Sequence, residues 1–409
     1  MKCRHCSNEL RIPFLDLGSA PPSNAYLTED ALRAPETCYP LRILACETCW
    51  LVQTEDHAGR EALFTDNYAY FSSFSSSWLA HAHAYVRAMQ SRFGLDAQSC
   101  VVEVAANDGY LLQYVKAAGI PCYGIEPTAS TARAAVDKGL LIIERFFGVA
   151  LASELAAQGR QADLMAANNV LAHVPDINDF VAGFTHLLKP QGIATFEFPH
   201  LLRMVQGFQF DTAYHEHYSY LSLTAVTRIF AVNGLRVFDV QELPTHGGSL
   251  RVFAQRADTG REPMQPAVAA LLTVEGAADM KQAAFYAQFQ LQSFRIVRGL
   301  LSFLIDQANQ GGRVAAYGAA AKGNTLLNFA GVRPHLLPYV VDKNPAKQGQ
   351  YLPGSRIPIV DEAHLKAHRP SHVLILPWNL KEEIMAQLDY VRAWGGKFVT
   401  AVPHVQEWL

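Results

Sequence analysis

The 409-residue sequence has few charged side chains and no cluster of positive charge. Charged residues make up 17% of it, the formal net charge is −3, and no block of lysine or arginine occurs. Proteins that bind nucleic acid regardless of sequence need clustered cations, so this composition argues against a nucleic-acid partner. Half of the residues are apolar, which allows large cores, and the length favours about two to three domains.

Long apolar runs are also missing. No stretch approaches the roughly 18 apolar residues that span a bilayer, and the first six residues lack the apolar core of a secretory signal. Cysteine is scarce, and four of the seven cysteines have metal-binding spacing, which favours a reducing compartment over a disulfide framework. We therefore expect a cytoplasmic protein with no membrane segment.

The cysteines near the N-terminus form two Cys-x-x-Cys pairs, Cys3 with Cys6 and Cys46 with Cys49. This spacing is that of a turn that aims two sulfurs at one ion, and two such turns supply the four ligands of a zinc site. Paired disulfides or free thiols are the alternatives. We predict a zinc-binding lobe over residues 1–65. The zinc should be structural, because four cysteine ligands leave no open position for a substrate.

Residues 66–257 alternate short apolar strands with helical stretches, the pattern of a parallel sheet built from βαβ units. Two further strands, close together, predict an antiparallel hairpin at the sheet edge. Seven strands in this order suit a class I methyltransferase fold. The strands are expected at residues 100–106, 122–126, 141–147, 163–168, 193–198, 237–242 and 250–255.

Residues 258–409 predict a linker with a long helix, followed by a second and smaller Rossmann-like α/β sheet. The predicted fold class is therefore α/β, with a zinc lobe, a methyltransferase domain and a Rossmann-like C-terminal domain. The strands of the last domain are expected at residues 314–317, 339–341, 373–376 and 398–402.

The turn at residues 103–109 reads Glu-x-Ala-x-Asn-Asp-Gly and lacks the three glycines that cradle a pyrophosphate. That absence argues against NAD, whereas the Asn-Asp-Gly turn offers acceptors for a cationic amino-acid group. Glu126 ends the next strand and can accept both ribose hydroxyls, as the acidic residue of dinucleotide folds does. Helix capping is the alternative for Glu126.

Phe146 and Phe147 are expected to end the third strand and to stack on adenine, with core packing as the alternative. Together these features predict a site for S-adenosylmethionine (SAM) at the carboxyl ends of the strands. Its candidate residues are Glu103, Ala105, Asn107, Asp108, Gly109, Glu126, Phe146, Phe147 and Asn168.

Residues 211–220 hold two histidines, a glutamate and three tyrosines. Histidine suits proton transfer near neutral pH, and a neighbouring carboxylate can orient an imidazole and raise its basicity. A second polar cluster, residues 245–249, contains glycines that permit close approach of a substrate. The alternatives are an aromatic core strand with hydrogen-bonded histidines, or a metal site of unfamiliar spacing. The aromatic and hydroxyl-rich segment 68–77 suggests either a site loop or an N-capping serine run.

Over essentially its full length the chain resembles the nucleotide-sugar C-methyltransferases of deoxysugar biosynthesis, whose best-known members act on TDP-3-amino-ketosugars. The residues that carry this resemblance lie in all three predicted domains. They are the paired cysteines, residues 16–18, 21–24, 68–73, 103–109, 216–217, 246–248 and 317–322, Asp342, and residues 378–379.

The resemblance implies that a base removes a proton beside the carbonyl of a 4-keto sugar. The enolate then attacks the SAM methyl group, forming a C–C bond and releasing S-adenosylhomocysteine. His217 is the expected base and His246 its rival. Glu216 and Tyr214 would orient the base or hold the substrate, and Tyr70 would donate to the enolate oxygen.

The C-terminal domain would clamp the nucleotide, with Tyr317, Lys322 and Asn379 as candidates. Lys322 is the natural partner of a diphosphate, with a plain surface charge as the alternative. The expected partner is a nucleotide sugar, TDP-linked, bound by a monomer. A zinc-containing methyltransferase of RNA or of another small molecule, and a non-catalytic scaffold, are the competing hypotheses.

Overall fold

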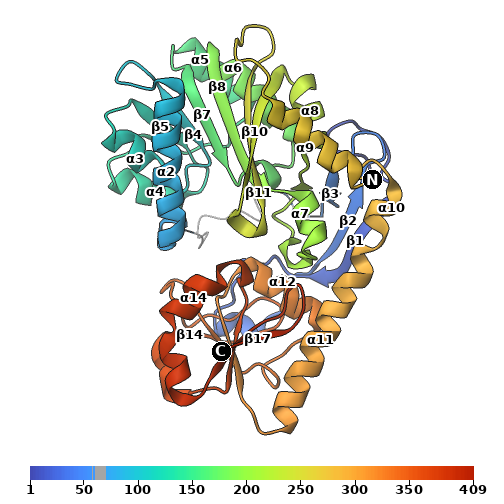
Figure 1. Ribbon diagram of the computed structural model, residues 1–409. Helices are drawn as coiled ribbons and strands as arrows, with labels where there is room; N and C mark the ends of the chain where they lie inside the picture. The colour runs from blue at the N-terminus through green and yellow to red at the C-terminus, as the bar shows by residue number, and fades with distance from the viewer. Residues whose placement is uncertain (58, 60–70) are drawn as a thin grey trace.

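Three separate β-sheets organise the chain, with four, seven and six strands (Figure 1). The computed structural model describes residues 1–57, 59 and 71–409. Within that part of the chain, no helix combines the length and the apolar character needed to cross a bilayer.

The four-stranded sheet belongs mostly to the N-terminal lobe and is antiparallel. Its last strand comes from the middle of the chain, because β9 pairs with β3 through Val52 and Gln53. The apolar face of the sheet buries Phe14 and Ile43. In spatial order the strands are β1 (Ile12–Ala20), β2 (Tyr39–Ala45), β3 (Val52–Thr54) and β9 (Ser219–Tyr220).

The seven-stranded sheet has five parallel strands and an antiparallel hairpin at one edge, as the sequence predicts. The third strand along the chain, β6, is much shorter than expected and ends at Ile143. In spatial order the strands are β10 (Leu235–Leu243), β11 (Ser249–Arg256), β8 (Leu188–Pro199), β7 (Ala162–Asn168), β4 (Val101–Val104), β5 (Cys122–Ile125) and β6 (Ile142–Ile143).

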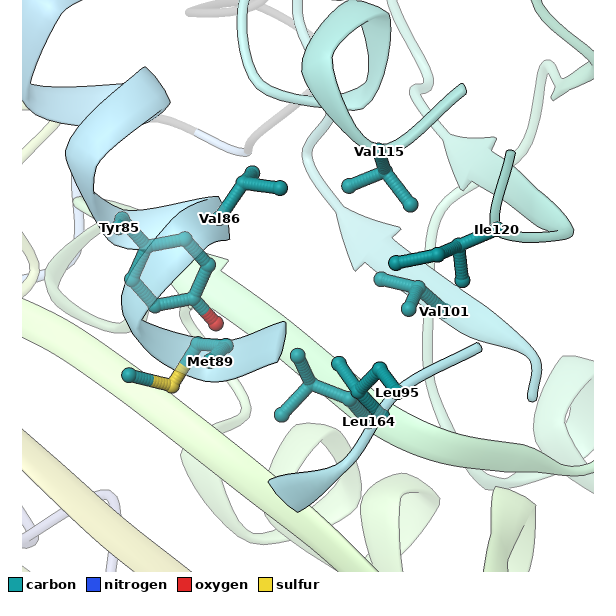
Figure 2. Close-up of a pocket in the computed structure, with 8 residues that line it drawn as sticks. All are labelled: Tyr85, Val86, Met89, Leu95, Val101, Val115, Ile120 and Leu164. Atoms are coloured by element: carbon teal, nitrogen blue, oxygen red, sulfur yellow. The ribbon is translucent and has the colours of Figure 1, made fainter. Parts of the chain in front are cut away.

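Helix α2 (Ser76–Phe93) covers one face of this sheet. The side chain of Ser75 accepts a hydrogen bond from the Trp78 amide and caps its start, and Gly94 ends it in the left-handed conformation. Figure 2 shows the core between α2, β4 and β7. The side chains drawn are apolar, apart from the hydroxyl group of Tyr85. That hydroxyl pairs with Thr195 Oγ1 at 2.6 Å, so the core is structural.

The remaining helices of this unit flank the sheet on its two faces, as its parallel strands require. They are α3 (Leu112–Ala117), α4 (Ala129–Asp137), α5 (Val149–Ala157), α6 (Ile177–Leu187), α7 (Leu201–Gln206) and α8 (Leu223–Val232).

Three helices connect this unit to the last one: α9 (Pro266–Ala277), α10 (Ala283–Ala287) and α11 (Phe289–Asn309). In Figure 1 they run down one side of the molecule, past the N-terminal lobe. Phe289 stacks on Phe14 of β1 with ring centroids 4.6 Å apart, which fastens α11 to that lobe.

The six-stranded sheet is parallel apart from its last strand. The first strand along the chain, β12, lies in the middle, so the strand order reverses between β12 and β15. In open α/β sheets, ligands bind at such a reversal. In spatial order the strands are β14 (Ile359–Val360), β13 (Val340–Val341), β12 (Val314–Tyr317), β15 (His372–Ile375), β16 (Lys397–Thr400) and β17 (Gln406–Trp408). The helices are α12 (Ala321–Ala330), α13 (Glu362–His368) and α14 (Lys381–Gln387).

Candidate active site and metal centre

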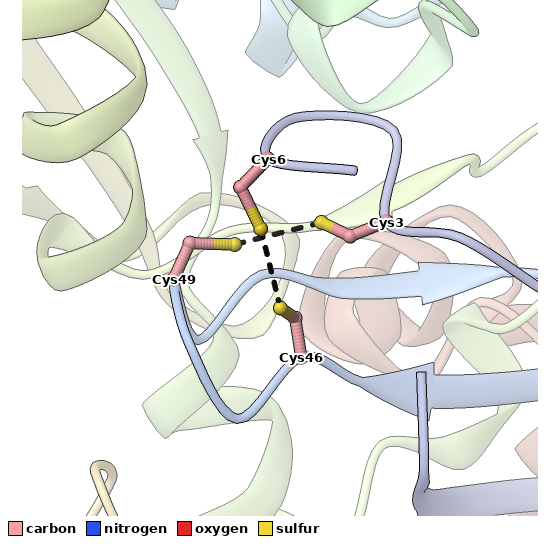
Figure 3. A group of neighbouring side chains, drawn as sticks. All are labelled: Cys3, Cys6, Cys46 and Cys49. Atoms are coloured by element: carbon pink, nitrogen blue, oxygen red, sulfur yellow. Dashed lines mark hydrogen bonds between the residues drawn. The ribbon is translucent and has the colours of Figure 1, made fainter. Parts of the chain in front are cut away.

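The four N-terminal cysteines converge on one point (Figure 3). Their sulfur atoms all lie within 4.8 Å of one another, and the Cys3–Cys49 and Cys6–Cys46 sulfurs are 3.5 Å apart. In the described residues this is the one group of three or more His, Cys, Asp or Glu side chains that could hold a metal. Four thiolates at tetrahedral spacing fit zinc.

Both cysteine pairs sit on similar turns. The amide of Ser7 donates to the Cys3 carbonyl and the amide of Trp50 donates to the Cys46 carbonyl, both at 2.9 Å. Ser7 and Trp50 have φ angles of 62° and 63°, the left-handed conformation that closes each turn. Gln53 Nε2 donates to the Cys3 sulfur at 3.1 Å, which favours its thiolate form.

The first cysteine turn is tied to the rest of the molecule by Arg4. Its guanidinium donates to the carbonyl oxygens of Pro175 (3.0 Å) and Thr54 (2.8 Å) and pairs with Asp56 at 2.8 Å. Zinc would therefore fix a turn that also contacts the methyltransferase-like unit and strand β3.

The turn after β4 has an irregular backbone. Ala105, Asn107 and Gly109 have φ angles of 59°, 48° and 76°. Glu126, at the end of β5, accepts hydrogen bonds from the amides of Asn107 (2.9 Å) and Thr128 (3.0 Å). Glu126 thus braces the turn, and ribose binding stays a proposal.

Carboxyl groups gather at this turn. Burial raises the pKa of Glu103 well above its ordinary value of 4.5, and it also raises the pKa of Glu126. Within the described residues, the buried Asp108 Oδ1 and Asn169 Oδ1 have no hydrogen-bond partner. These acceptors fit SAM, which carries a sulfonium and an ammonium charge.

A wall of side chains that the sequence did not predict stands beside this turn. The Trp78 ring on α2 lies 4.8 Å from the His81 ring and 5.3 Å from the His246 ring. Glu197 of β8 is buried and pairs with His81 (2.8 Å) and Arg251 (2.5 Å). A glutamate inside an apolar strand was the available signal, because a buried charge needs partners.

The segment 210–220 lies between the units. Its last residues form β9 of the N-terminal sheet, and Thr54 Oγ1 donates to the His217 carbonyl at 2.7 Å. The backbone of the histidine is therefore held by the N-terminal lobe.

The hydrogen bonds of His217 define its tautomer. Its Nδ1 lies 2.7 Å from the Thr212 carbonyl, which can only accept, so Nδ1 carries the proton. Its Nε2 therefore accepts from the Tyr214 hydroxyl at 2.7 Å. Burial and the neighbouring His173, whose ring centroid is 4.6 Å away, hold the pKa of His217 well below 6.5. The imidazole is neutral near pH 7 and can take up a proton.

Glu216 faces away from this pair. Its Oε2 accepts from Asn24 Nδ2 of the N-terminal lobe at 2.7 Å, and burial raises its pKa to about 7. The Thr212 carbonyl, and not Glu216, meets the His217 ring nitrogen, so Glu216 does not orient the base. The alternative that Glu216 holds the substrate stays a prediction. Asn24 is a further residue of the site, and its segment 21–24 was among the motifs of the family resemblance.

The C-terminal unit closes the site from the other side. Lys322 Nζ lies 3.3 Å from Asn379 Oδ1 and 4.9 Å from the centre of the Trp378 ring. The Trp378 indole donates to Asp211 Oδ2 at 2.7 Å. Two of the predicted substrate residues are thus brought together.

The second polar cluster also contacts the C-terminal unit. Gly247 has a φ of +88°, and a Cβ there would lie 2.6 Å from a Trp378 ring carbon, so only glycine fits. Next to it, His246 Nε2 accepts from Asn169 Nδ2 at 3.2 Å, and burial lowers its pKa to about 4.

Comparison with known proteins covers nearly the whole chain. Three family profiles match it: a zinc-binding domain described as putative over residues 3–64, a methyltransferase domain over 78–240, and a C-methyltransferase C-terminal domain over 244–403. The C-methyltransferase NovU of Streptomyces niveus is 32% identical over 402 residues, which cover 98% of this chain and 95% of that protein. The chain belongs to this C-methyltransferase family.

Solved structures match in part. Magnesium protoporphyrin IX methyltransferase of Synechocystis PCC 6803 with bound SAH is 15% identical, over 44% of this chain and 83% of that one, with a TM-score of 0.35. A SAM-dependent methyltransferase from Clostridium acetobutylicum is 11% identical, over 44% and 92%, with a TM-score of 0.36. The protein is a SAM-dependent C-methyltransferase with a class I fold, a four-cysteine zinc site and an additional C-terminal sheet.

Two other expectations about this enzyme need correction. Phe146 and Phe147 lie in the loop between β6 and α5 and do not end a strand, because β6 stops at Ile143. The Phe147 ring packs edge-on against Phe180 and Phe184 at 5.6 and 5.2 Å, which is core packing. Phe146 is 37% exposed.

Tyr317 does not join Lys322 and Asn379. Its hydroxyl accepts from Gln387 Nε2 at 2.6 Å and lies 3.4 Å from Glu362, so it is occupied within its own domain. Successive side chains of β12 point to opposite faces of the sheet. Tyr317 lies on one face, whereas Ala316 and α12, which carries Lys322, lie on the other. Tyr70 lies outside the described residues. Beyond it, the Ser72 and Ser73 amides donate to Asn107 and Asp108 of the cofactor turn.

Proposed function

We propose that this enzyme methylates a carbon atom beside the keto group of a nucleotide-linked 4-keto-deoxysugar, with TDP as the nucleotide. The observation that carries the proposal is the neutral, buried His217, whose Nε2 accepts from Tyr214 at a point where all three units meet. Methylation of oxygen or nitrogen needs only an activated heteroatom, whereas carbon needs a positioned, unprotonated base that removes the C–H proton and forms an enolate.

The chain's own residues divide this work between them. Tyr214 and His217 form the proton acceptor: the substrate C–H proton passes to the tyrosine oxygen as the tyrosine proton passes to Nε2. Their tautomer needs no adjustment, because the Thr212 carbonyl already holds the Nδ1 proton. Bound SAM would supply a methyl group on a cationic sulfur: the methyl carbon can accept the electron pair of the enolate carbon, while the S–C bonding pair stays on sulfur.

The nucleotide end of the substrate fits the C-terminal unit. Helix α12 begins at the strand-order reversal, and no side chain caps its first turn, so its amides can bind a diphosphate. Gly318 (φ +91°) makes the tight turn before it, and Gly323 lets the helix pack on Leu376, where a Cβ would lie 2.7 Å from a methyl carbon. These are the roles of glycine in dinucleotide folds. One chain supplies every part of the site, so we propose that a monomer acts.

The test replaces the base. His217→Gln should lower methyl transfer from labelled SAM to a TDP-linked 4-keto-6-deoxyhexose by about 10²- to 10⁴-fold. SAM affinity, measured by calorimetry, should stay nearly unchanged. The exposed His335→Gln is the matched control. Full turnover by His217→Gln would hand the role to His246 or Tyr70. Failure of the wild type to methylate any such ketosugar would refute the proposed function.

A further inference from the structure

We infer that Lys322 is a catalytic residue whose ammonium group binds the keto oxygen of the substrate and stabilises the negative charge of the enolate. This inference rests on the proposed function and deepens it. It replaces the expectation that Lys322 binds the diphosphate.

A chain of contacts links Lys322 to the residues around the base. Lys322 Nζ lies against the Trp378 ring, at 4.9 Å from its centre, and the indole N–H of that ring is bonded to Asp211. Asp211 directly precedes Thr212, whose carbonyl holds the base His217. The side chains of Trp378 and Asp211 therefore connect the Lys322 ammonium group to the loop that orients His217, although Lys322 comes from another domain.

The same tryptophan also contacts the second polar cluster, residues 245–249. Trp378 packs against Gly247, and the next residue back along the chain is His246. Burial is the main cause of the lowered pKa of both His217 and His246, and the positive charge of Lys322 adds to it, for His217 after the larger effect of His173. Lys322 and the turn that carries His246 thus contact the same tryptophan.

Lys322 also has bonding capacity that its described contacts do not use. An ammonium group has three N–H donors. In the described part of the chain, one hydrogen bond of Lys322 is found, to the neutral amide of Asn379 at 3.3 Å. Burial lowers the pKa of Lys322, and the Asp211 carboxylate opposes that effect. An oxyanion beside it would stabilise its charged form further.

A diphosphate at the same place would work against the reaction. Its negative charges would favour the protonated form of nearby imidazoles, and a protonated His217 cannot accept a proton. Lys322 belongs to the first turn of α12, but its side chain extends to Asn379, so the uncapped backbone amides of that turn offer the diphosphate an anchor of their own. A keto oxygen is neutral until the proton leaves, so Lys322 would stabilise it only when charge develops.

The electron balance of the step is simple. The C–H bonding pair becomes the C=C bond, the proton goes to the Tyr214–His217 pair, and the carbonyl π pair moves to oxygen beside Lys322. The new C–C bond would use the C=C pair, the S–C bonding pair of the methyl donor would stay on sulfur, and the oxygen pair would return to the carbonyl. No oxidant or reductant is needed.

Exchange of the substrate's C–H hydrogen with D₂O tests this step without methyl transfer, in the presence of S-adenosylhomocysteine. Lys322→Met should lower the exchange rate at saturating TDP-ketosugar by about 10²- to 10³-fold, the size of effect seen when one oxyanion donor is lost. The affinity for TDP alone should change by less than about threefold. Lys322→Arg should restore part of the rate. The exposed Lys343→Met, in the same unit, is the control.

Other outcomes contradict the inference in different ways. An unchanged exchange rate with TDP affinity reduced tenfold or more would return Lys322 to the diphosphate. No change in either would make it a surface charge. Lys322→Gln gives the same readouts if the methionine variant does not fold. A wild type that exchanges no ketosugar hydrogen would refute the proposed function itself.

Discussion

Glu216 should make the enzyme less stable as the pH rises. The residue is 1% exposed, its carboxyl group accepts from Asn24, and burial raises its pKa from 4.5 to about 7. The folded protein therefore holds this proton more tightly than the unfolded chain does. The contribution to stability is fully present below pH 4.5 and is lost as the pH rises through about 7.

The magnitude follows from the two pKa values. A difference between 4.5 and about 7 corresponds to about 3 kcal/mol in the free energy of unfolding. Glu216→Gln keeps the size of the side chain and a partner for Asn24, but it has no proton to lose. Relative to the wild type, the variant should therefore gain about 3 kcal/mol between pH 4 and pH 8.

Urea unfolding at several pH values measures this gain. The matched control is Glu382→Gln, because the Glu382 side chain is 79% exposed. The quantity to follow is the free-energy difference between variant and wild type, which cancels the titration of all other groups. A difference that stays constant from pH 4 to pH 8 would show that Glu216 is charged in the folded protein and would refute the reasoning.

Two further perturbations test the metal centre and the domain contact. Cys46→Ser, or chelation of zinc, should unfold the N-terminal lobe and lower the midpoint of thermal unfolding. Methyl transfer should also fall, because the segment of His217 loses its support at β3. A folded, zinc-free and fully active variant would show that the zinc has no such role. Gly247→Ala should destabilise the protein by about 1–3 kcal/mol, because its φ is +88° and the new Cβ would meet Trp378. Gly276→Ala, where a Cβ meets nothing within 4 Å, should instead stabilise α9 by up to about 1 kcal/mol, and equal losses in the two variants would contradict this explanation.

The sequence predicts what local pattern determines. The cysteine spacing identifies the metal site, because two short turns already contain the ligand geometry. The alternation of apolar strands identifies both α/β sheets, including the antiparallel hairpin of β10 and β11. The short strands β14 and β17 could not be predicted in this way, since two or three residues carry no periodicity.

What depends on distant contacts could not be predicted. Phe147 reads as a cofactor residue until its contacts with Phe180 and Phe184 are known. The Glu-His pair at 216–217 suggests one catalytic unit, but the two residues lie in a turn closed by the His217 amide and the Tyr214 carbonyl, and their side chains meet different partners. Glu216 accordingly meets Asn24, and His217 meets Tyr214.

The pairing of β9 with β3 has a consequence for how this enzyme can be divided. The segment that carries Tyr214 and His217 is encoded in the middle of the methyltransferase region but forms a strand edge with the zinc lobe. A fragment that begins after the lobe would keep the SAM turn and lose the scaffold of the base. Exchanging N-terminal lobes between relatives would then alter the geometry of proton abstraction, so this lobe is a place to look for differences in substrate choice.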